Sequence, residues 1–142
     1  MYISDTAAHV FAISAGQISL LSAVRGFTLA IDSKDRLYSG NSSSLIRFSS
    51  AGGAEDLSTW LKRSGIQHIG AIGVDAADNV YVASGVQNAV HAYPFYQFTP
   101  SGVSHPLQST FDQVNSIAIT AGGNIWLAAG FLMNAQGYFL GQ

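Results

Sequence analysis

One short phrase, in which an aromatic residue is flanked by apolar neighbours, recurs four times along the chain. The four copies are Met1-Tyr2-Ile3-Ser4, Leu37-Tyr38-Ser39-Gly40, Val80-Tyr81-Val82-Ala83 and Ile125-Trp126-Leu127-Ala128. The aromatic residues of successive copies lie 36, 43 and 45 residues apart. A chain that repeats one pattern at this period folds as an array of similar units, because each unit must bury its apolar face against the next. The repeat therefore constrains the fold more than any single residue does.

Each repeat contains the elements of a small antiparallel sheet. Three copies of the phrase follow another apolar run and a short polar turn, and these runs are Thr28 to Asp32, Ile72 to Asp75 and Ile117 to Thr120. Two apolar runs around a tight polar turn predict a β-hairpin. Third runs ending in a glycine turn follow at Val10 to Gly16, Ile46 to Gly52 and Tyr96 to Gly102, and fourth runs at Ile18 to Val24, Ala54 to Leu61 and Val103 to Leu107. Four antiparallel strands in roughly 40 to 45 residues are typical of a β-propeller blade.

The hairpin of the third unit also resembles a known repeat. Residues 72–84 read IGVDAADNVYVAS, and this segment resembles the NHL-type β-propeller repeat. The resemblance covers nearly the whole chain and implies a propeller, but similar families include ligand-binding domains, sugar-lactone hydrolases and a streptogramin-opening lyase, so it selects no activity. The Asp that often follows the second strand in this family is present at Asp5. The other units carry Asn41, Ser84 and Ala129 there, so the role of that Asp is not carried over to them.

The number of expected strands predicts a single all-β array over residues 1–142, with two complete and two partial four-stranded blades. The first unit begins inside its second strand, and the last unit ends after an expected third strand at Gly137 to Leu140. Because a propeller needs at least about four blades around its axis, we expect these blades to be a segment of a larger propeller. Ring closure by homo-oligomerisation and completion of the terminal blades by a partner are the alternatives.

The amino-acid composition limits which kinds of partner and which cellular compartment we expect. The chain is 48% hydrophobic and only 10% charged, compared with about 25% charged in an average soluble domain. A surface of uncharged polar residues favours an extracellular, periplasmic or virion setting, although surfaces buried in an assembly explain low charge equally well. With a net charge of -2 and only 6 Lys and Arg residues, nucleic acid is not an expected partner. Every apolar run is shorter than the roughly 20 residues of a membrane-spanning helix.

A candidate ligand site lies in the loop between the second and third strands of the third unit. In a propeller blade these loops and the connections between blades open on one face of the disc, which usually carries the ligand site. Comparison of the repeat steps locates an insertion between Gly85 and Phe95. His91, Tyr93 and Phe95 in this loop could present aromatic faces to a sugar ring or a peptide, with Pro94 limiting the backbone. The alternative is that Tyr93 and Phe95 pack over the blade edge.

The connections between units supply polar candidates on the same face. These residues are Arg25, Gln67, His68, Asp112, Gln113 and Asn115. Because they are spaced one blade apart, they could converge near the axis and line a ligand pocket. Each of these residues could instead have an ordinary structural role and no part in ligand binding. The charged ones could be solvated loop residues, the amides could hydrogen-bond within turns, and His68 could be a structural histidine.

Two further features are expected to be structural. Asp32 and Asp75 recur at the mouth of the hairpin, where a short carboxylate accepts backbone N–H bonds in an Asx turn, and Thr120 replaces them in the last unit. The stretch 54–62 could form a helical turn instead of a full strand. In that case Leu57, Trp60 and Leu61 share one side of it and pack against the blade.

The sequence contains few residues or motifs that could support catalysis. The chain has no cysteine, and its four histidines show no ligand spacing. No HExxH pair, nucleophile elbow or Walker loop occurs, so we assign no catalytic residue, metal site or cofactor. The sequence favours a non-enzymatic binding or structural module that uses a propeller face for a glycan, a peptide or a neighbouring subunit. The alternative is a fragment of a propeller enzyme, lactone hydrolase or lyase-like, with an axial metal site lined by His68 and Asn115.

Overall fold

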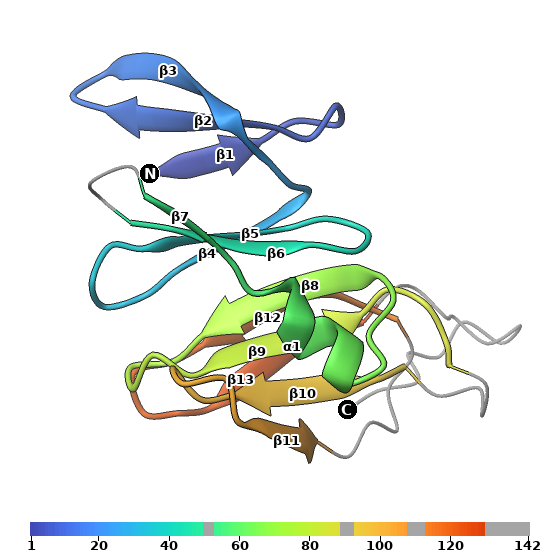
Figure 1. Ribbon diagram of the computed structural model, residues 1–142. Coiled ribbons are helices and arrows are strands. Elements are labelled where there is room, and N and C mark those ends of the chain that lie inside the picture. The colour runs from blue at the N-terminus through green and yellow to red at the C-terminus, as the bar shows by residue number, and fades with distance from the viewer. Residues whose placement is uncertain (50–52, 89–92, 108–112, 130–142) are drawn as a thin grey trace, which may run out of the picture.

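The computed structural model describes residues 1–49, 53–88, 93–107 and 113–129, and these fold into four antiparallel sheets (Figure 1). The first sheet contains β1 (Tyr2–Ser4), β2 (His9–Ser14) and β3 (Gln17–Arg25), and the second contains β4 (Thr28–Ile31), β5 (Leu37–Gly40), β6 (Leu45–Phe48) and β7 (Ala54–Asp56). The third contains β8 (Ile69–Val74), β9 (Val80–Ser84), β10 (Phe95–Phe98) and β11 (Ser104–Leu107), and the fourth contains β12 (Val114–Ile119) and β13 (Ile125–Ala129). A short helix, α1 (Ser58–Arg63), connects the second sheet to the third.

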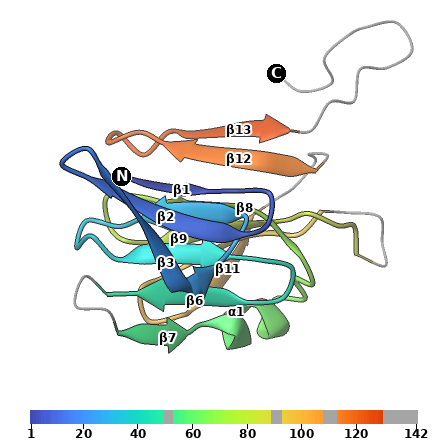
Figure 2. The same ribbon diagram turned by 90° about the horizontal axis from the view of Figure 1, so that it is seen from above.

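The four sheets are consecutive propeller blades, here called blades 1 to 4. In blades 2 and 3 the strands pair in sequence order, so that β4 and β8 form one edge and β7 and β11 form the other. The first strands of successive blades lie next to one another, β4 beside β8 and β8 beside β12, as strands do around a propeller axis. Figure 2 places β12 and β13 along one margin of the molecule. The all-β blade architecture expected from the repeat is therefore confirmed.

One expected strand is shorter than its apolar run. The run at 54–61 continues as a strand only to Asp56, whose carboxylate accepts the backbone N–H of Ser58 at 2.8 Å, and α1 begins there. The expected fourth strand is therefore correct only in its first three residues, and the helical turn that was the alternative forms the rest. Leu57, Trp60 and Leu61 are all buried, as their spacing indicated. The expected third strand of the last unit, at residues 137–140, lies outside the described residues. Among the described residues, no helix has the length and apolar composition that a membrane span requires.

The core consists of apolar clusters that lie between neighbouring blades. The largest is between blades 2 and 3, where the rings of Trp60 and Phe98 stack with centroids 5.5 Å apart. Alternation along each strand sends side chains to two such clusters: Val80 and Val82 join the cluster shared with blade 2, whereas Tyr81 joins the one shared with blade 4. We call the side of a blade that faces the preceding blade its back face and the other side its front face.

The turns carry the residue types that their backbone geometry requires. Gly16 and Gly102 have φ values of 76° and 84°, as expected for sharp turns. Asp32 Oδ1 accepts two backbone N–H bonds at 2.9 and 3.0 Å, and Asp75 Oδ1 accepts two at 2.9 Å. Thr120 Oγ1 accepts one at 3.1 Å. The Asx turns expected at these positions are therefore confirmed, including the substitution by Thr.

Candidate functional site

The predicted insertion lies where the repeat comparison located it. The connection between β9 and β10 covers residues 85–94, whereas the equivalent connection between β5 and β6 covers only residues 41–44. The backbone N–H of Gly85 donates to the carbonyl of His68 at 2.7 Å, so this loop opens on the same side as the connection that leads into β8. The start of this loop and the connection into β8 are therefore neighbours, whereas the clustering of all such loops on one face of the disc stays a prediction.

The aromatic residues predicted for this loop have different environments. Phe95 is buried in β10, and its ring lies 6.3 Å from that of Tyr81 in the core between blades 3 and 4. Tyr93 is half-buried, and His91 lies outside the described residues. For Phe95 the geometry favours packing over presentation to a ligand. An alanine substitution at Phe95 would consequently disturb the core and would not report on ligand binding alone.

The polar candidates lie at the ends of strands and in connections. Arg25 is the last residue of β3, Gln67 is exposed and His68 is half-buried just before β8, and Asn115 is exposed on β12. Gln113 is exposed before β12, and Asp112 lies outside the described residues. In the part of the chain that the structure describes, no three His, Asp or Glu side chains are grouped as a metal site requires. A ligand site built from these residues stays a prediction.

A small cavity of about 240 Å³ lies next to the long loop, at the end of blade 3. Its lining is Ser64, Gly65, Asn88, Pro94, Phe95, Tyr96, Pro106 and Leu107. Ser64 is buried, and its hydroxyl makes no hydrogen bond within the described structure. The volume is below the roughly 300 Å³ at which small-molecule pockets usually begin. The cavity has the size for one small group or a few water molecules.

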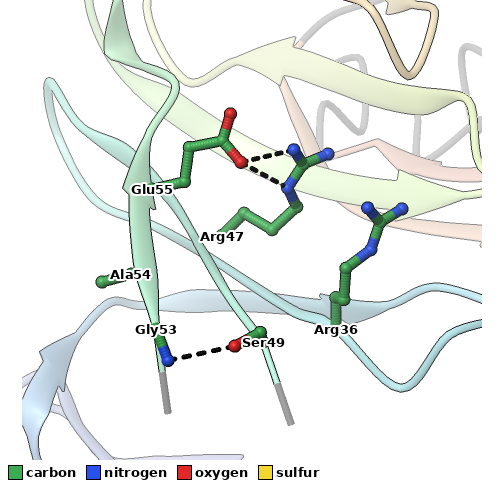
Figure 3. Close-up of a pocket in the computed structure, with 6 residues that line it drawn as sticks. All are labelled: Arg36, Arg47, Ser49, Gly53, Ala54 and Glu55. Atoms are coloured by element: carbon green, nitrogen blue, oxygen red, sulfur yellow. Dashed lines mark hydrogen bonds and ion pairs between the residues drawn. The ribbon is translucent and has the colours of Figure 1, made fainter. Parts of the chain in front are cut away.

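A second depression, of about 320 Å³, lies on blade 2 and is lined by charged side chains (Figure 3). Arg36 reaches it from the β4–β5 turn, and Arg47 and Glu55 reach it from β6 and β7. The Arg47 guanidinium donates to the Glu55 carboxylate through Nε at 3.1 Å and through Nη2, and the backbone N–H of Gly53 donates to Ser49 Oγ at 3.0 Å. Most of this lining is therefore engaged within the blade.

The charges around this depression tie blade 2 to blade 3. Arg36 Nε donates to Asp32 at 2.6 Å, and its Nη2 lies 3.7 Å from Asp78, in the hairpin turn of blade 3. Asp78 also accepts the backbone N–H of Ser33 at 2.9 Å, which is the main reason that the pKa of Asp78 lies below its usual range. Lys34 Nζ lies 3.6 Å from the same carboxylate. Cations and carboxylates balance here, so the depression forms part of an interblade latch and offers no excess charge to a ligand.

A polar network at the repeated tyrosine was missed by the sequence analysis. The Tyr81 hydroxyl donates to Asp75 at 3.1 Å and accepts from Gln97 at 2.9 Å. In blade 2 the equivalent Tyr38 hydroxyl accepts from Arg47 at 3.3 Å. The available signal was the strand register, which places a long polar residue of the third strand opposite each tyrosine. The aromatic repeat position thus supplies a hydrogen-bonding hydroxyl as well as apolar surface.

The side chain at the repeated aromatic position is buried in the inner blades and exposed in blade 4. Tyr38 is 0% exposed and Tyr81 is 7% exposed, because each lies on a front face covered by the next blade. Tyr2 packs in the same way against blade 2. Trp126 is 65% exposed. No described element covers the front face of blade 4.

The neighbours of the aromatic residue are also repeated. Two small residues flank it on each front face, one directly opposite on the first strand and one two positions further along its own strand. These pairs are Ala30 and Gly40 beside Tyr38, Gly73 and Ala83 beside Tyr81, and Ala118 and Ala128 beside Trp126. Blade 4 therefore carries a large ring between two small residues, as blades 2 and 3 do, but both of its small residues are alanines, whereas each inner blade has one glycine.

The opposite end of the array exposes an aliphatic back face. Ile3, Phe11 and Leu20 lie side by side across β1, β2 and β3, and Ile13 lies opposite Ile18. Ile3, Ile18 and Leu20 are 42%, 66% and 52% exposed. In blades 2, 3 and 4 the back face packs against the preceding blade. The two end faces thus expose surfaces whose equivalents form the core inside the array.

Comparison with known proteins supports the fold. No model of a known protein family matches the chain, and no curated protein matches it either. Among solved structures, virginiamycin B lyase from Staphylococcus aureus, a β-propeller, is similar with a TM-score of 0.61 and 15% identity over 86% of this chain. The chain spans 42% of the length of that lyase. The extracellular domain of a hybrid two-component system from B. thetaiotaomicron is also similar, with a TM-score of 0.42 and 10% identity over 89% of this chain and 24% of that domain.

Proposed function

We propose that this chain is a non-enzymatic interaction module that binds neighbouring propeller blades through its two end faces. The observation that carries the proposal is the 65% exposure of Trp126 at a repeat position that is buried in blades 2 and 3. The partner that fits this face is a blade, because the front faces of blades 1, 2 and 3 each bind the back face of a blade. Large contiguous apolar surfaces on soluble proteins usually mark interaction sites.

The internal junctions show how such a face recognises a blade. A Cβ added to Gly40 would lie 2.6 Å from Cδ1 of Ile72, and a Cβ added to Gly73 would lie 2.5 Å from Cγ2 of Ile117. The small residues of a front face therefore leave recesses that the aliphatic side chains of the next blade fill. Close packing of this kind makes the contact selective for shape as well as for hydrophobicity. Ala118 and Ala128 occupy the corresponding positions beside Trp126, and their Cβ atoms make that face shallower there than a glycine would.

The geometry favours a neighbouring subunit over a glycan or a peptide as the partner. The exposed apolar side chains lie on sheet faces at the ends of the array, whereas the two cavities are small or lined by charges that are paired within the protein. The similarity to the lyase concerns the fold, so its reaction is not part of this proposal. A propeller enzyme with an axial metal site remains a separate hypothesis, which a thermal melt with and without calcium tests.

Site-specific photo-crosslinking tests the proposal. A photoreactive phenylalanine analogue placed at position 126 should crosslink, in material from the native source, to a β-strand of a propeller repeat identified by peptide mass spectrometry. The matched control carries the analogue at Phe27, an aromatic residue that is 56% exposed in the connection between blades 1 and 2. Equal crosslinking at both positions, or crosslinking of position 126 to something other than a blade, would contradict the proposal.

A further inference from the structure

We propose that Asn41 is a modification site, at which an N-linked glycan is attached and packs against Phe27. The site lies in the turn between β5 and β6, away from both end faces, so it goes beyond the proposed function and does not depend on it. Asn41, Ser42 and Ser43 form the pattern Asn-X-Ser with a residue other than proline in the middle. This pattern is the acceptor signal for N-glycosylation. A pattern this short also occurs by chance, so its structural setting decides its meaning.

The turn presents this pattern on the surface of blade 2. The connection between β5 and β6 covers residues 41–44, in which Ser42 and Ser43 are exposed and Asn41 is half-buried. A bulky, solvated glycan requires an acceptor on a surface turn of this kind, where it meets no packed core. The fold therefore has room for the modification.

The hydrogen bonds of Asn41 use only one end of its side-chain amide. Oδ1 accepts the backbone N–H groups of Ser43 at 3.2 Å and Ser44 at 3.0 Å, and the Ser44 hydroxyl at 2.7 Å. A backbone N–H donates and never accepts, so the atom that receives two of them is the oxygen of the amide. The nitrogen has no hydrogen-bond partner among the described residues. This nitrogen is the atom that carries an N-linked glycan, so attachment leaves the turn intact.

The same position in blade 1 shows that the turn alone does not require an asparagine. Asp5 Oδ1 accepts the backbone N–H groups of Ala7 and His9, each at 2.9 Å. A carboxylate therefore supplies the turn bonds equally well. Asn41 keeps such bonds and adds an amide nitrogen that the fold does not use. The hydroxyl of Ser43, the other group that defines the acceptor signal, likewise makes no hydrogen bond within the described structure.

An exposed aromatic residue lies next to this turn. The backbone N–H of Phe27 donates at 2.9 Å to the carbonyl of Gly40, the residue before Asn41, and Phe27 is more than half exposed. A sugar ring has a side formed by C–H groups, and this side packs against the face of an aromatic ring. The first sugar on Asn41 would be within reach of Phe27 and would remove apolar surface from water.

Attachment of the glycan is a group transfer from a lipid-linked donor. Nδ2 of Asn41 attacks C1 of a sugar that is carried on a lipid diphosphate. The C1–N bond forms as the bond from C1 to the phosphate oxygen breaks, and the lipid diphosphate leaves with the electron pair. A base of the transferase takes the proton from Nδ2, and the Ser43 hydroxyl marks Asn41 for the transferase. The extracellular setting predicted from the composition would bring the chain past such an enzyme during export.

Mass spectrometry of the chain from its native source tests the modification. Trypsin cuts after Arg36 and Arg47 and releases residues 37–47, with Asn41, as one peptide. A peptide N-glycosidase converts a glycosylated Asn into Asp and, in water enriched in oxygen-18, introduces a heavy oxygen there. We expect the peptide to appear with this heavy oxygen only after the enzyme treatment. Recovery of the unmodified peptide alone, before and after treatment, would overturn the proposal.

Two serine variants, secreted from a host cell that N-glycosylates its proteins, separate the acceptor signal from the turn. Ser43→Ala removes the signal but keeps the backbone N–H that Asn41 accepts, whereas Ser44→Ala removes a bond of the turn but keeps the signal. We expect Ser43→Ala to lose the mass of the glycan and Ser44→Ala to retain it. Circular dichroism verifies that both variants fold. A glycan at position 41 of Ser43→Ala, or its absence from the unaltered secreted chain, would contradict the proposal.

Thermal unfolding tests the contact with Phe27. Enzymatic removal of the glycan from the unaltered chain should lower the melting temperature, because the Phe27 ring returns to water. The same treatment of Phe27→Ser should lower the melting temperature much less, and each protein serves as its own control before and after treatment. Equal decreases in the two proteins would show that the sugar does not pack on Phe27 and would overturn this part of the proposal.

Discussion

At the scale of single residues, short polar side chains hold the turns of this array. Asp32 and Asp75 could be assigned to Asx turns from the sequence, because carboxylates at a hairpin mouth bind backbone N–H groups locally. The position after the second strand keeps a hydrogen-bond acceptor even where it is not Asp: Asp5 and Asn41 each accept two backbone N–H bonds, and Ser84 accepts one. The departure from the family pattern there thus preserves the turn in these three units.

Asp78 could not be assigned from the sequence. Its partner Ser33 is 45 residues away and belongs to the preceding blade, so only the packing of two blades brings them together. Local patterns reveal hydrogen bonds within a turn, whereas bonds between turns of different blades depend on the fold. The hydroxyl bonds of Tyr38 and Tyr81 lie within one blade, and they were missed because they depend on the register between its second and third strands.

Substitution of Asp78 tests the interblade latch. The pKa of Asp78 is lowered, chiefly by the backbone N–H of Ser33, and Lys34 and Arg36 also face it. The carboxylate therefore stabilises the fold above the ordinary Asp pKa of about 3.9, and this stabilisation is lost as the pH falls through the lower pKa of the folded state. At neutral pH we expect Asp78→Ala to reduce the free energy of unfolding by about 1–3 kcal/mol, because it removes a charged acceptor.

The control for this test is Asp78→Asn. Asp78 has a φ of 62°, a conformation that Asn adopts readily, and Asn retains an oxygen for the Ser33 N–H. It should therefore cost less than Asp78→Ala and should weaken the acid dependence of stability below about pH 4. Denaturant unfolding across this pH range measures both effects. Equal stability of Asp78→Ala and the unaltered chain would contradict the latch.

At the scale of elements, apolar runs and turn residues predicted most of the strands. They located the second strands directly, and they located the insertion between β9 and β10 from the repeat spacing. The end of β7 was harder to predict from the sequence, because the pattern of residues 54–61 fits an apolar strand and also fits a helical turn. Tertiary burial of Leu57, Trp60 and Leu61 between two blades decides in favour of α1. The recess at Gly73 also could not be predicted from the sequence, because it depends on which side chains of the next blade lie opposite.

Gly73→Ala tests the packing between blades. The added Cβ would lie 2.5 Å from Cγ2 of Ile117, so blade 4 must shift, and we expect a loss of about 1–3 kcal/mol in the free energy of unfolding. Gly122→Ala is the matched control, because its nearest neighbour, Thr120 Oγ1, would be 3.8 Å away. Adding Ile117→Ala to Gly73→Ala should restore part of the loss relative to the sum of the single effects. Strict additivity would show that the two residues are not in contact.

At the scale of the whole molecule, the array exposes at both ends the kinds of surface that it buries inside. The sequence predicted two complete and two partial blades and therefore an incomplete ring. The sequence could not predict which side chains each end exposes, because this depends on which side of each sheet faces the neighbouring blade. Burial of surfaces in an assembly and an extracellular, periplasmic or virion setting both remain predictions to explain the low charge.

The fluorescence of Trp126 tests the central claim most directly. The chain has 2 tryptophans, and Trp60 is 8% exposed whereas Trp126 is 65% exposed, so comparison with Trp126→Phe isolates the signal of the exposed ring. Acrylamide quenching would be measured on the purified chain and on the complex that the chain forms in material from the native source, with the molecular mass followed on the same samples. We predict that quenching of Trp126 is several-fold lower in the complex than in the free chain. Equal quenching of Trp126 in the complex and in the free chain would contradict the claim that this face binds a blade.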